Sequence, residues 1–295
     1  MAKTSLNRAY VEIGNVCNLA CSFCPGTTRE ARRMTEAEFC CVAEKLRPHT
    51  EYLYLHVMGE PLFHPTLDRF LLIASEYGFR VCITTNGTLL GTRGNVLLSH
   101  AETIHKVSIS LHSMEGNDVV SAVEGELDGR TEAYLHSAVD FAYEASARGI
   151  YTVFRLWNLD SAEHKGSHRE NDAILSYLHT AFPDEWKERH DGMRLMKNVF
   201  LEYAEIFTWP TESEAEEQES GFCHGLCDQI AVLADGTVVP CCLDSEGEIA
   251  LGNLYDSTLD AILASDRATA MREGFRNRKL VEPLCRTCTY ARRFR

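Results

Sequence analysis

The chain has 295 residues, of which 45% are hydrophobic, so it is long enough to bury a core as one large domain or a large and a small one. No run approaches the ~18 apolar residues of a membrane-spanning helix, and the first residues hold no apolar stretch of secretory-signal length. We therefore expect a soluble, cytoplasmic protein without a membrane partner. Its 29 Lys and Arg against 43 Asp and Glu give a net charge of −14, which disfavours nucleic-acid binding.

Apolar strand-like runs alternate with helical periodicity along the first 210 residues. This pattern predicts parallel strands wrapped by helices, and about 200 residues are too few for eight units. We therefore expect an α/β fold, an incomplete (β/α)6 TIM-like barrel. The predicted strands are 8–16, 52–58, 79–85, 105–112, 150–158 and 198–205, and the predicted helices are 35–46, 67–78, 89–100, 131–149 and 170–181.

The composition changes at residues 211–221, which are acidic and lack aliphatic side chains. Such a segment is typical of a solvated linker. We place the domain boundary there, with a barrel domain at 1–210 and a small α+β domain at 222–295. The small domain contains six cysteines, a predicted strand pair and a predicted helix.

Three cysteines lie close together in the stretch VCNLACSFCPG: Cys17, Cys21 and Cys24. In a reducing cytoplasm, clustered cysteines favour metal ligation over disulfides. They follow a predicted strand, at the strand end where barrel folds keep their chemistry. Three thiolates leave one position open on a cluster. The alternatives are incidental thiols, or a zinc site that takes a fourth ligand such as His56.

The spacing C-x-x-x-C-x-x-C, with Phe23 before the last cysteine, resembles the radical S-adenosylmethionine (SAM) enzymes. The stretch MGEP at 58–61 resembles the G-G-E-P motif of that family, with Met58 replacing its first glycine. The resemblance implies that Cys17, Cys21 and Cys24 hold a [4Fe-4S] cluster whose fourth iron binds SAM. It also assigns Gly59 and Glu60 to the amino group of SAM.

Polar side chains end the next three predicted strands on the same rim, where the resemblance implies contact with SAM or substrate. Each residue also has a structural interpretation: Asn86 precedes Gly87 in an ordinary turn, and the serines are small enough to be packed residues. An arginine on a covered strand needs an anionic or carbonyl partner. The candidates are Thr85, Asn86, Ser108, Ser110, His112 and Arg155, of which His112 and Arg155 are also candidate catalytic residues.

The C-terminal cysteines, with the stretches DGTVVPC and LGNL and a final C-x-x-C, resemble the auxiliary-cluster extension of the same enzymes, called SPASM with two clusters and twitch with one. Six cysteines are too few for two clusters, so we expect one auxiliary [4Fe-4S] cluster. Cys242 points away from Cys241 by strand alternation; an unligated cysteine here is also a candidate hydrogen-atom donor. A zinc ribbon is the alternative. The expected ligands are Cys223, Cys241, Cys285 and Cys288, with Cys227 as the alternative to Cys223.

The resemblance implies reductive cleavage of SAM to a 5′-deoxyadenosyl radical, which abstracts a hydrogen atom from the substrate. With an auxiliary cluster as electron acceptor, we expect oxidation of a small polar substrate, of the alcohol-to-ketone type. The short segment before Cys17, without room for a leader-binding domain, favours a small molecule. The alternatives are a peptide-modifying enzyme, which forms a crosslink, an epimer or an oxidised side chain, and a zinc-binding module without catalysis. The expected protein partner is a one-electron reductant such as flavodoxin or ferredoxin.

Overall fold

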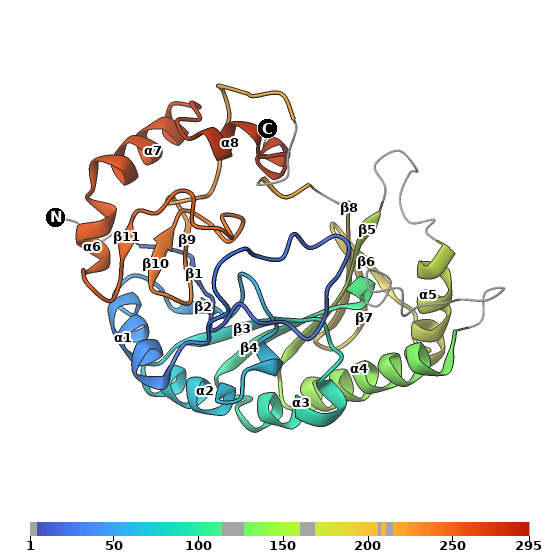
Figure 1. Ribbon diagram of the computed structural model, residues 1–295. Helices are drawn as coiled ribbons and strands as arrows, with labels where there is room; N and C mark the ends of the chain where they lie inside the picture. The colour runs from blue at the N-terminus through green and yellow to red at the C-terminus, as the bar shows by residue number, and fades with distance from the viewer. Residues whose placement is uncertain (1–4, 114–126, 160–168, 206–207, 211–214, 295) are drawn as a thin grey trace. The chain divides into compact units, whose positions relative to one another are not determined.

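The computed structural model of the chain describes residues 5–113, 127–159, 169–205, 208–210 and 215–294 (Figure 1). Contacts divide the chain into two compact units, one of residues 1–17, 25–81 and 207–295, the other of residues 18–24 and 82–206. Both ends of the chain thus belong to the first unit, whereas the domains expected from the sequence follow one another along the chain. Among the described helices, none combines the length and the apolar character that crossing a membrane requires.

The first unit is built on a short strand, β1 (Arg8–Val11), with parallel neighbours on both sides. On one side lies β2 (Tyr52–Tyr54), and on the other lies β9 (Gln229–Val232) from the C-terminal segment. The strands β10 (Thr237–Val239) and β11 (Gly252–Asn253) continue beyond β9 in antiparallel fashion. The predicted strand pair near the C-terminus is therefore confirmed, and it joins the N-terminal strand in one sheet.

Helices of the first unit begin at side chains that satisfy their first N–H groups. Thr35 caps α1 (Glu36–Leu46) in a reciprocal capping box with Glu38. Thr258 caps α6 (Leu259–Leu263), and Ser265 caps α7 (Asp266–Arg276). Each side chain accepts a hydrogen bond from a backbone N–H in the first turn of its helix. The remaining helices of this unit are α2 (Leu67–Glu76), α8 (Pro283–Thr287) and the 3₁₀ turns η1 (Pro61–Phe63) and η5 (Tyr290–Arg293).

The second unit contains the later parallel strands and their helices. The strands β4 (Ile104–Ser110), β5 (Tyr151–Leu159) and β8 (Val199–Glu205) are parallel neighbours. The strand β3 (Arg80–Thr85) begins at the end of the first unit and runs into the second. The helices α3 (Leu90–Ser99) and α4 (Gly129–Ala147) lie side by side along these strands (Figure 1). The 3₁₀ turn η2 (Leu111–Ser113) follows β4, and α5 (Arg169–Ala181) follows β5. The expected α/β class with parallel strands is confirmed.

An antiparallel hairpin that the sequence analysis did not predict adds to the edge of β8. It consists of β6 (Lys187–Arg189) and β7 (Gly192–Met196), and β7 pairs with β8. All three residues of β6 are exposed, so the segment has no alternation of apolar and polar residues that would reveal a strand.

The strands β4 and β5 have one apolar and one polar face. Val107, Ile109 and Phe154 are fully buried on the apolar face. Ser110 lies directly opposite Arg155 in the parallel register, so both point from the other face, as does Ser108. The polar candidates from the sequence thus share one side of the sheet in the second unit.

Candidate functional site

In the first unit, the MGEP loop lies against the chain just before Cys17. Gly59 has φ +77°, and a Cβ on it would come within 2.3 Å of the Gly14 carbonyl oxygen and 3.0 Å of Val16 backbone atoms. The Glu60 N–H donates to the Val16 carbonyl at 3.1 Å. Only glycine tolerates both this backbone conformation and this close approach. The second glycine position of the family motif is therefore required by the local packing.

Glu60 is buried, with 4% of its surface exposed. Its Oε1 accepts from the Leu62 N–H at 2.9 Å and so caps the short turn η1. The side chain also borders a small cleft with Gly14, Val16 and His64. Glu60 is thus held in place by its own turn, at the loop where the resemblance assigns it to SAM.

A buried ion pair that the sequence analysis missed holds together the segments around this loop. The Glu12 carboxylate, fully buried at the end of β1, accepts from Arg29 Nη1 at 2.9 Å and Nη2 at 2.7 Å. It also accepts from the backbone N–H groups of Met58 and Ala234 at 3.2 and 3.1 Å. Arg29 Nε donates to the Ser245 carbonyl at 2.8 Å. The arm that follows the cysteine loop, the MGEP loop and the C-terminal segment therefore meet at one carboxylate.

In the second unit, the middle of the cysteine loop packs beside the end of β4. The Cys24 N–H donates to the Cys21 carbonyl at 3.0 Å, which closes a turn between the two cysteines. The Cys21 thiol lies 3.9 Å from the Ser113 carbonyl oxygen, and the Phe23 ring lies 4.9 Å from that of His112. Cys21 is partly exposed and Cys24 is exposed, as is Cys17 in the first unit. All three thiols are thus accessible to an incoming cluster.

Asn86 links the end of β3 to the cysteine loop. Its Nδ2 donates to Asn18 Oδ1 at 3.0 Å, and its Oδ1 accepts from Thr88 Oγ1 at 2.7 Å. Thr85 Oγ1 accepts from the Gly87 N–H at 3.0 Å. Asn18, which the sequence analysis did not single out, also donates to Thr88 at 2.9 Å. Both ends of the Asn86 amide therefore bind protein groups that hold the loop.

Arg155 has a protein partner that the sequence did not reveal. Its Nε lies 3.9 Å from Glu202 Oε2 on the neighbouring strand β8, and its guanidinium lies 4.3 Å above the Trp157 ring. Ser108 is fully buried, and among the described residues its hydroxyl has no hydrogen-bond partner. A buried hydroxyl without a partner is costly, which makes it suited to a bound polar group.

His112 is a buried residue with structural contacts. Its Nδ1 lies 3.1 Å from the Arg155 carbonyl oxygen and 3.4 Å from the Trp157 backbone nitrogen. Burial lowers the pKa of His112 to about 4, although the Arg155 carbonyl opposes the shift. The imidazole is therefore neutral near pH 7 and a weak proton acceptor there.

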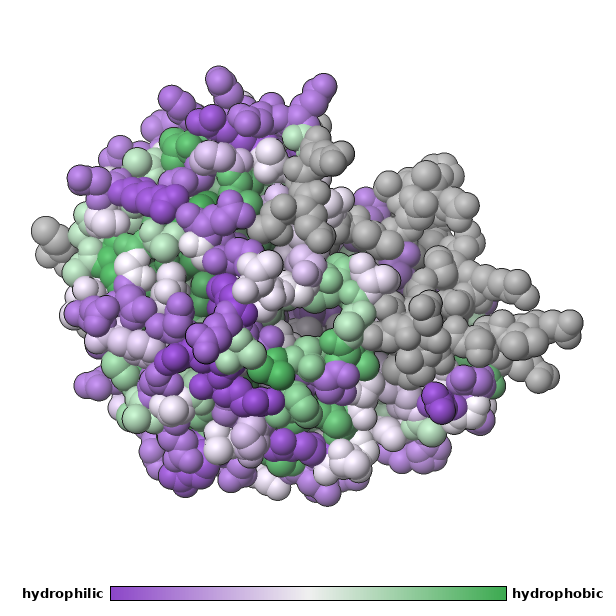
Figure 2. Space-filling model, viewed as in Figure 1, coloured by the Kyte–Doolittle hydropathy of each residue, from purple (hydrophilic) through white to green (hydrophobic). Residues whose placement is uncertain are grey.

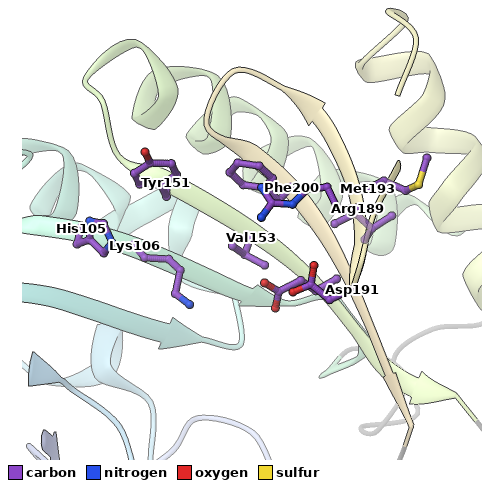
Figure 3. Close-up of a pocket in the computed structure, with 10 residues that line it drawn as sticks. His105, Lys106, Tyr151, Val153, Arg189, Asp191, Met193 and Phe200 are labelled. Atoms are coloured by element: carbon purple, nitrogen blue, oxygen red, sulfur yellow. The ribbon is translucent and has the colours of Figure 1, made fainter. Parts of the chain in front are cut away.

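A cavity of about 320 Å³ lies at the other end of β4, β5 and β8. Figure 3 shows Lys106 and Tyr151 toward one end of it, Arg189 and Asp191 toward the other, and Val153 between them. Because these side chains belong to the amino ends of the strands and to the hairpin, the cavity lies away from the strand ends that carry chemistry in barrel folds. The predicted site residues do not line it.

In the first unit, four cysteines that are distant in sequence come together. Burial raises the pKa of Cys223 to about 11, with further contributions from Cys288 and Cys227. Burial also raises the pKa values of Cys241 and Cys285, and the nearby thiol of Cys223 raises both further. Thiolates so placed repel one another unless iron binds them, so this donor set fits an iron-sulfur cluster.

Cys227 and Cys242 also lie near this group. The thiol of Cys227 raises the pKa of Cys223, and the pKa of Cys227 itself responds to burial, Asp228, Arg276 and Arg272. Cys242 is half-buried like the other four, and Cys223 raises the pKa of its thiol whereas Tyr10 lowers it. Within the described residues, no three Cys, His, Asp or Glu side chains converge as closely as a single metal ion requires. A four-iron cluster separates its thiolates more widely than a single ion does.

Two family models match the chain. The Radical SAM superfamily model matches residues 11–135, and the SPASM iron-sulfur cluster-binding domain model matches residues 223–289. The first match contains the cysteine loop, the MGEP loop and β4, and the second contains all four grouped cysteines. A search of curated proteins gave no significant match.

Solved structures of similar fold cover nearly the whole chain. BtrN in complex with AdoMet and 2-DOIA is 18% identical with a TM-score of 0.54, over 97% of this chain and 94% of that one. Streptococcus suis SuiB bound to S-adenosylmethionine is 14% identical with a TM-score of 0.60, over 91% of this chain and 68% of that one. Native anSMEcpe with bound AdoMet is 13% identical with a TM-score of 0.60, over 96% of this chain and 86% of that one. The chain belongs to the radical SAM superfamily, carries a C-terminal SPASM iron-sulfur domain, and is an enzyme whose cofactors are a [4Fe-4S] cluster, SAM and an auxiliary iron-sulfur cluster.

Proposed function

We propose that this radical SAM enzyme oxidises a small polar substrate by two electrons, of the alcohol-to-ketone type. The bound cofactors would supply hydrogen-atom abstraction at the first site and one-electron acceptance at the second. The observation that carries the proposal is the grouping of four half-buried thiols in the C-terminal segment, the ligand complement of one cluster. A cluster held by these thiols would give the substrate electron a destination.

We assign the ligands by the groupings described above. Cys17, Cys21 and Cys24 hold the first cluster, because they are accessible and carry the spacing of the family. Cys223 is preferred to Cys227, because its thiol interacts with those of Cys241, Cys285 and Cys288.

The chain's own residues bind and orient SAM and the substrate. In the first unit, Gly59 and Glu60 are proposed to present the MGEP loop to the amino group of SAM. In the second unit, Phe23, Thr85 and Asn86 hold the cysteine loop and the loop after β3. The remaining polar residues, Ser108, Ser110 and Arg155, face one side of β4 and β5 and are proposed to bind polar groups of SAM or substrate. His112 is better suited to positioning the Phe23 ring than to accepting a proton, because its pKa is about 4.

The neighbouring structures support two substrate classes. The match to BtrN, solved with AdoMet and 2-DOIA, spans 94% of that chain, so the two proteins have similar extents. SuiB bound to its precursor peptide SuiA and anSMEcpe with a Cp18Cys peptide are matched over 71% and 84% of their chains. A peptide substrate is therefore the second candidate.

The test removes two auxiliary ligands and follows both half-reactions. Cys285→Ala with Cys288→Ala should preserve SAM cleavage to 5′-deoxyadenosine but abolish the oxidised product, provided that circular dichroism shows a folded domain. The matched control is Cys227→Ala, which should retain iron content and product formation. A folded double variant that forms oxidised product at the normal rate would refute the acceptor role.

A substrate panel separates the two candidates. Deuterated polyols and aminocyclitols on one side, and deuterated peptides on the other, would be incubated with the reduced holoenzyme and SAM. Deuterium in 5′-deoxyadenosine from a polyol or aminocyclitol, with a ketone as product, supports the proposal. Transfer only from peptides would replace it with the second candidate.

A further inference from the structure

The last thirty residues of the chain carry charge opposite to that of the whole protein. Residues 266–295 contain nine Lys and Arg but only three Asp and Glu, so this segment carries +6 in a chain of net charge −14. The same segment contains Cys285 and Cys288. A segment of net positive charge therefore carries two proposed auxiliary ligands.

Several of these cations already have acidic or carbonyl partners. Arg267 forms a two-pronged pair with Glu282, at 2.7 and 2.8 Å. Arg286 lies 3.6 Å from Glu217, and Arg292 donates to the backbone carbonyl of residue 216 at 2.8 Å. Part of the acidic segment 211–221 thus lies along the basic segment, although residues 211–214 are outside the described residues.

The cations at the end of α7 are different. Arg276, Arg278 and Lys279 are exposed and form no ion pair with any described residue. Arg272, one turn earlier, is half-buried and forms a 3.5 Å hydrogen bond with Thr269. We call these four residues the α7 basic surface. Figure 2 shows hydrophilic side chains gathered over α7.

The geometry of this surface is fixed by the backbone. Arg278 has φ +54°, a conformation that side-chain-bearing residues rarely adopt. Its carbonyl accepts from the Gly221 N–H at 2.9 Å, and the Lys279 N–H donates to the Gly274 carbonyl at 2.7 Å. Arg276 lies in the last turn of α7, where the helix dipole favours a cation, and Arg278 and Lys279 follow the C-cap Asn277.

The α7 basic surface also lies next to the segment that carries Cys223. The Gly221 N–H donates to the Arg278 carbonyl at 2.9 Å, and Ser220 forms an antiparallel bridge with Lys279. Cys223, which groups with the other proposed ligands, follows Gly221 by two residues. A partner seated on this surface would therefore lie beside the auxiliary site.

We propose that the α7 basic surface docks an acidic one-electron carrier protein and brings its redox group to the auxiliary cluster. The proposal rests on the proposed function, in which each turnover takes one electron from a reductant at the first site. The substrate loses one hydrogen atom to the 5′-deoxyadenosyl group, one proton to solvent and one electron to the auxiliary cluster. That electron must leave before the next turnover, and the oxidised carrier accepts it. Attraction between opposite charges would speed this encounter.

The experiment compares two charge reversals on the holoenzyme, with flavodoxin as the acidic probe. Arg278→Glu with Lys279→Glu changes the α7 basic surface outside the helix, and Lys187→Glu with Lys197→Glu is the control on exposed residues of the second unit. Binding would be measured by titration calorimetry at low and high salt. We expect the control to bind like the wild type and the surface variant to bind about tenfold more weakly at low salt, with the difference shrinking as salt rises.

Thermal unfolding and iron content of the variants exclude a folding defect. Arg276→Gln, which removes one charge without reversing it, should show a smaller loss of flavodoxin affinity. Equal binding by the surface variant and the wild type would overturn the proposal. So would binding of RNA to the wild type in place of flavodoxin, because the surface would then be a general polyanion site. Failure to find an oxidised product would refute the proposed function, whereas a salt-dependent loss of flavodoxin binding would still support the docking surface.

Discussion

Glu12 and Arg29 form a fully satisfied ion pair inside the first unit: both terminal nitrogens of Arg29 donate to the two oxygens of Glu12, at 2.9 and 2.7 Å. Two backbone N–H groups and the Ser245 carbonyl complete the network. Because the carboxylate is fully buried, the Arg29 guanidinium and the two backbone N–H groups take the place of water around its charge.

Arg29→Met should lower the free energy of unfolding by about 3–5 kcal/mol, because it leaves the Glu12 charge buried with only two backbone donors. Urea unfolding under anaerobic conditions measures this loss. The matched control is Arg69→Met, which breaks the exposed pair with Glu36 at 3.2 Å and should cost less than about 1 kcal/mol. Equal losses in the two variants would show that the buried network contributes little.

Gly59→Ala should abolish SAM binding, because the added Cβ would lie 2.3 Å from the Gly14 carbonyl oxygen and displace the MGEP loop. Gly149→Ala is the matched control: Gly149 has φ +84°, but a Cβ there has no neighbour within 4 Å. The control should cost about 1–2 kcal/mol of stability and leave the SAM affinity unchanged. Equilibrium dialysis with SAM checks both, and normal affinity in Gly59→Ala would contradict the close-packing argument.

Much of the fold could be predicted from the sequence, because buried strands and helices carry periodic apolar patterns. The helix 170–181 corresponds to α5 (Arg169–Ala181), and the strand 198–205 corresponds to β8 (Val199–Glu205). The strand expected at 8–16 ends at Val11, where Glu12 enters the ion pair with Arg29. The hairpin of β6 and β7 was missed because its outer strand is entirely exposed.

The sequence predicted the motifs of the candidate site, but not the contacts that hold these motifs in place. The local spacing marked the cysteines and the MGEP loop, since those residues are close in sequence. The partners that hold them come from distant positions: Glu202 for Arg155, and Arg29 for Glu12. Periodicity within one element contains no information about a partner on another element. A clue was present in Glu12, a carboxylate within an apolar strand, which required a buried cation or several donors.

His112 should make stability depend on pH. Its pKa is about 4 in the folded protein and about 6.5 when unfolded, so the unfolded state binds more protons between these values. The contribution of neutral His112 to stability is therefore complete above about pH 6.5 and is lost as pH falls toward 4. Below about pH 6.5, His112→Gln should reduce the slope of unfolding free energy against pH by about 1 kcal/mol per pH unit. Urea unfolding from pH 5.5 to 7.5 tests this, and identical slopes would show that His112 is not buried as a neutral ring.

Charge reversal at Glu217 should have little effect on SAM cleavage. Glu217 is 61% exposed, and its pair with Arg286 spans 3.6 Å, so its removal should cost less than about 1 kcal/mol. The rate of 5′-deoxyadenosine formation by Glu217→Lys would be compared with that of the wild type. A large decrease would mean that the acidic segment contributes to the active site, against the interpretation of a solvated segment.

Replacing Cys17, Cys21 and Cys24 together by Ala should remove about half of the iron and all SAM cleavage. The auxiliary iron should persist, because the ligands proposed for it come from other segments, Cys223 to Cys241 and Cys285 to Cys288. Iron and sulfide analysis of anaerobically purified protein measures the first effect, and chromatography of 5′-deoxyadenosine measures the second. Cys40→Ala is the control, since its thiol lies 3.4 Å from the Tyr77 hydroxyl and away from both cysteine groups in sequence. Retained SAM cleavage in the triple variant would refute the ligand assignment, and complete loss of iron would show that the two clusters are not assembled independently.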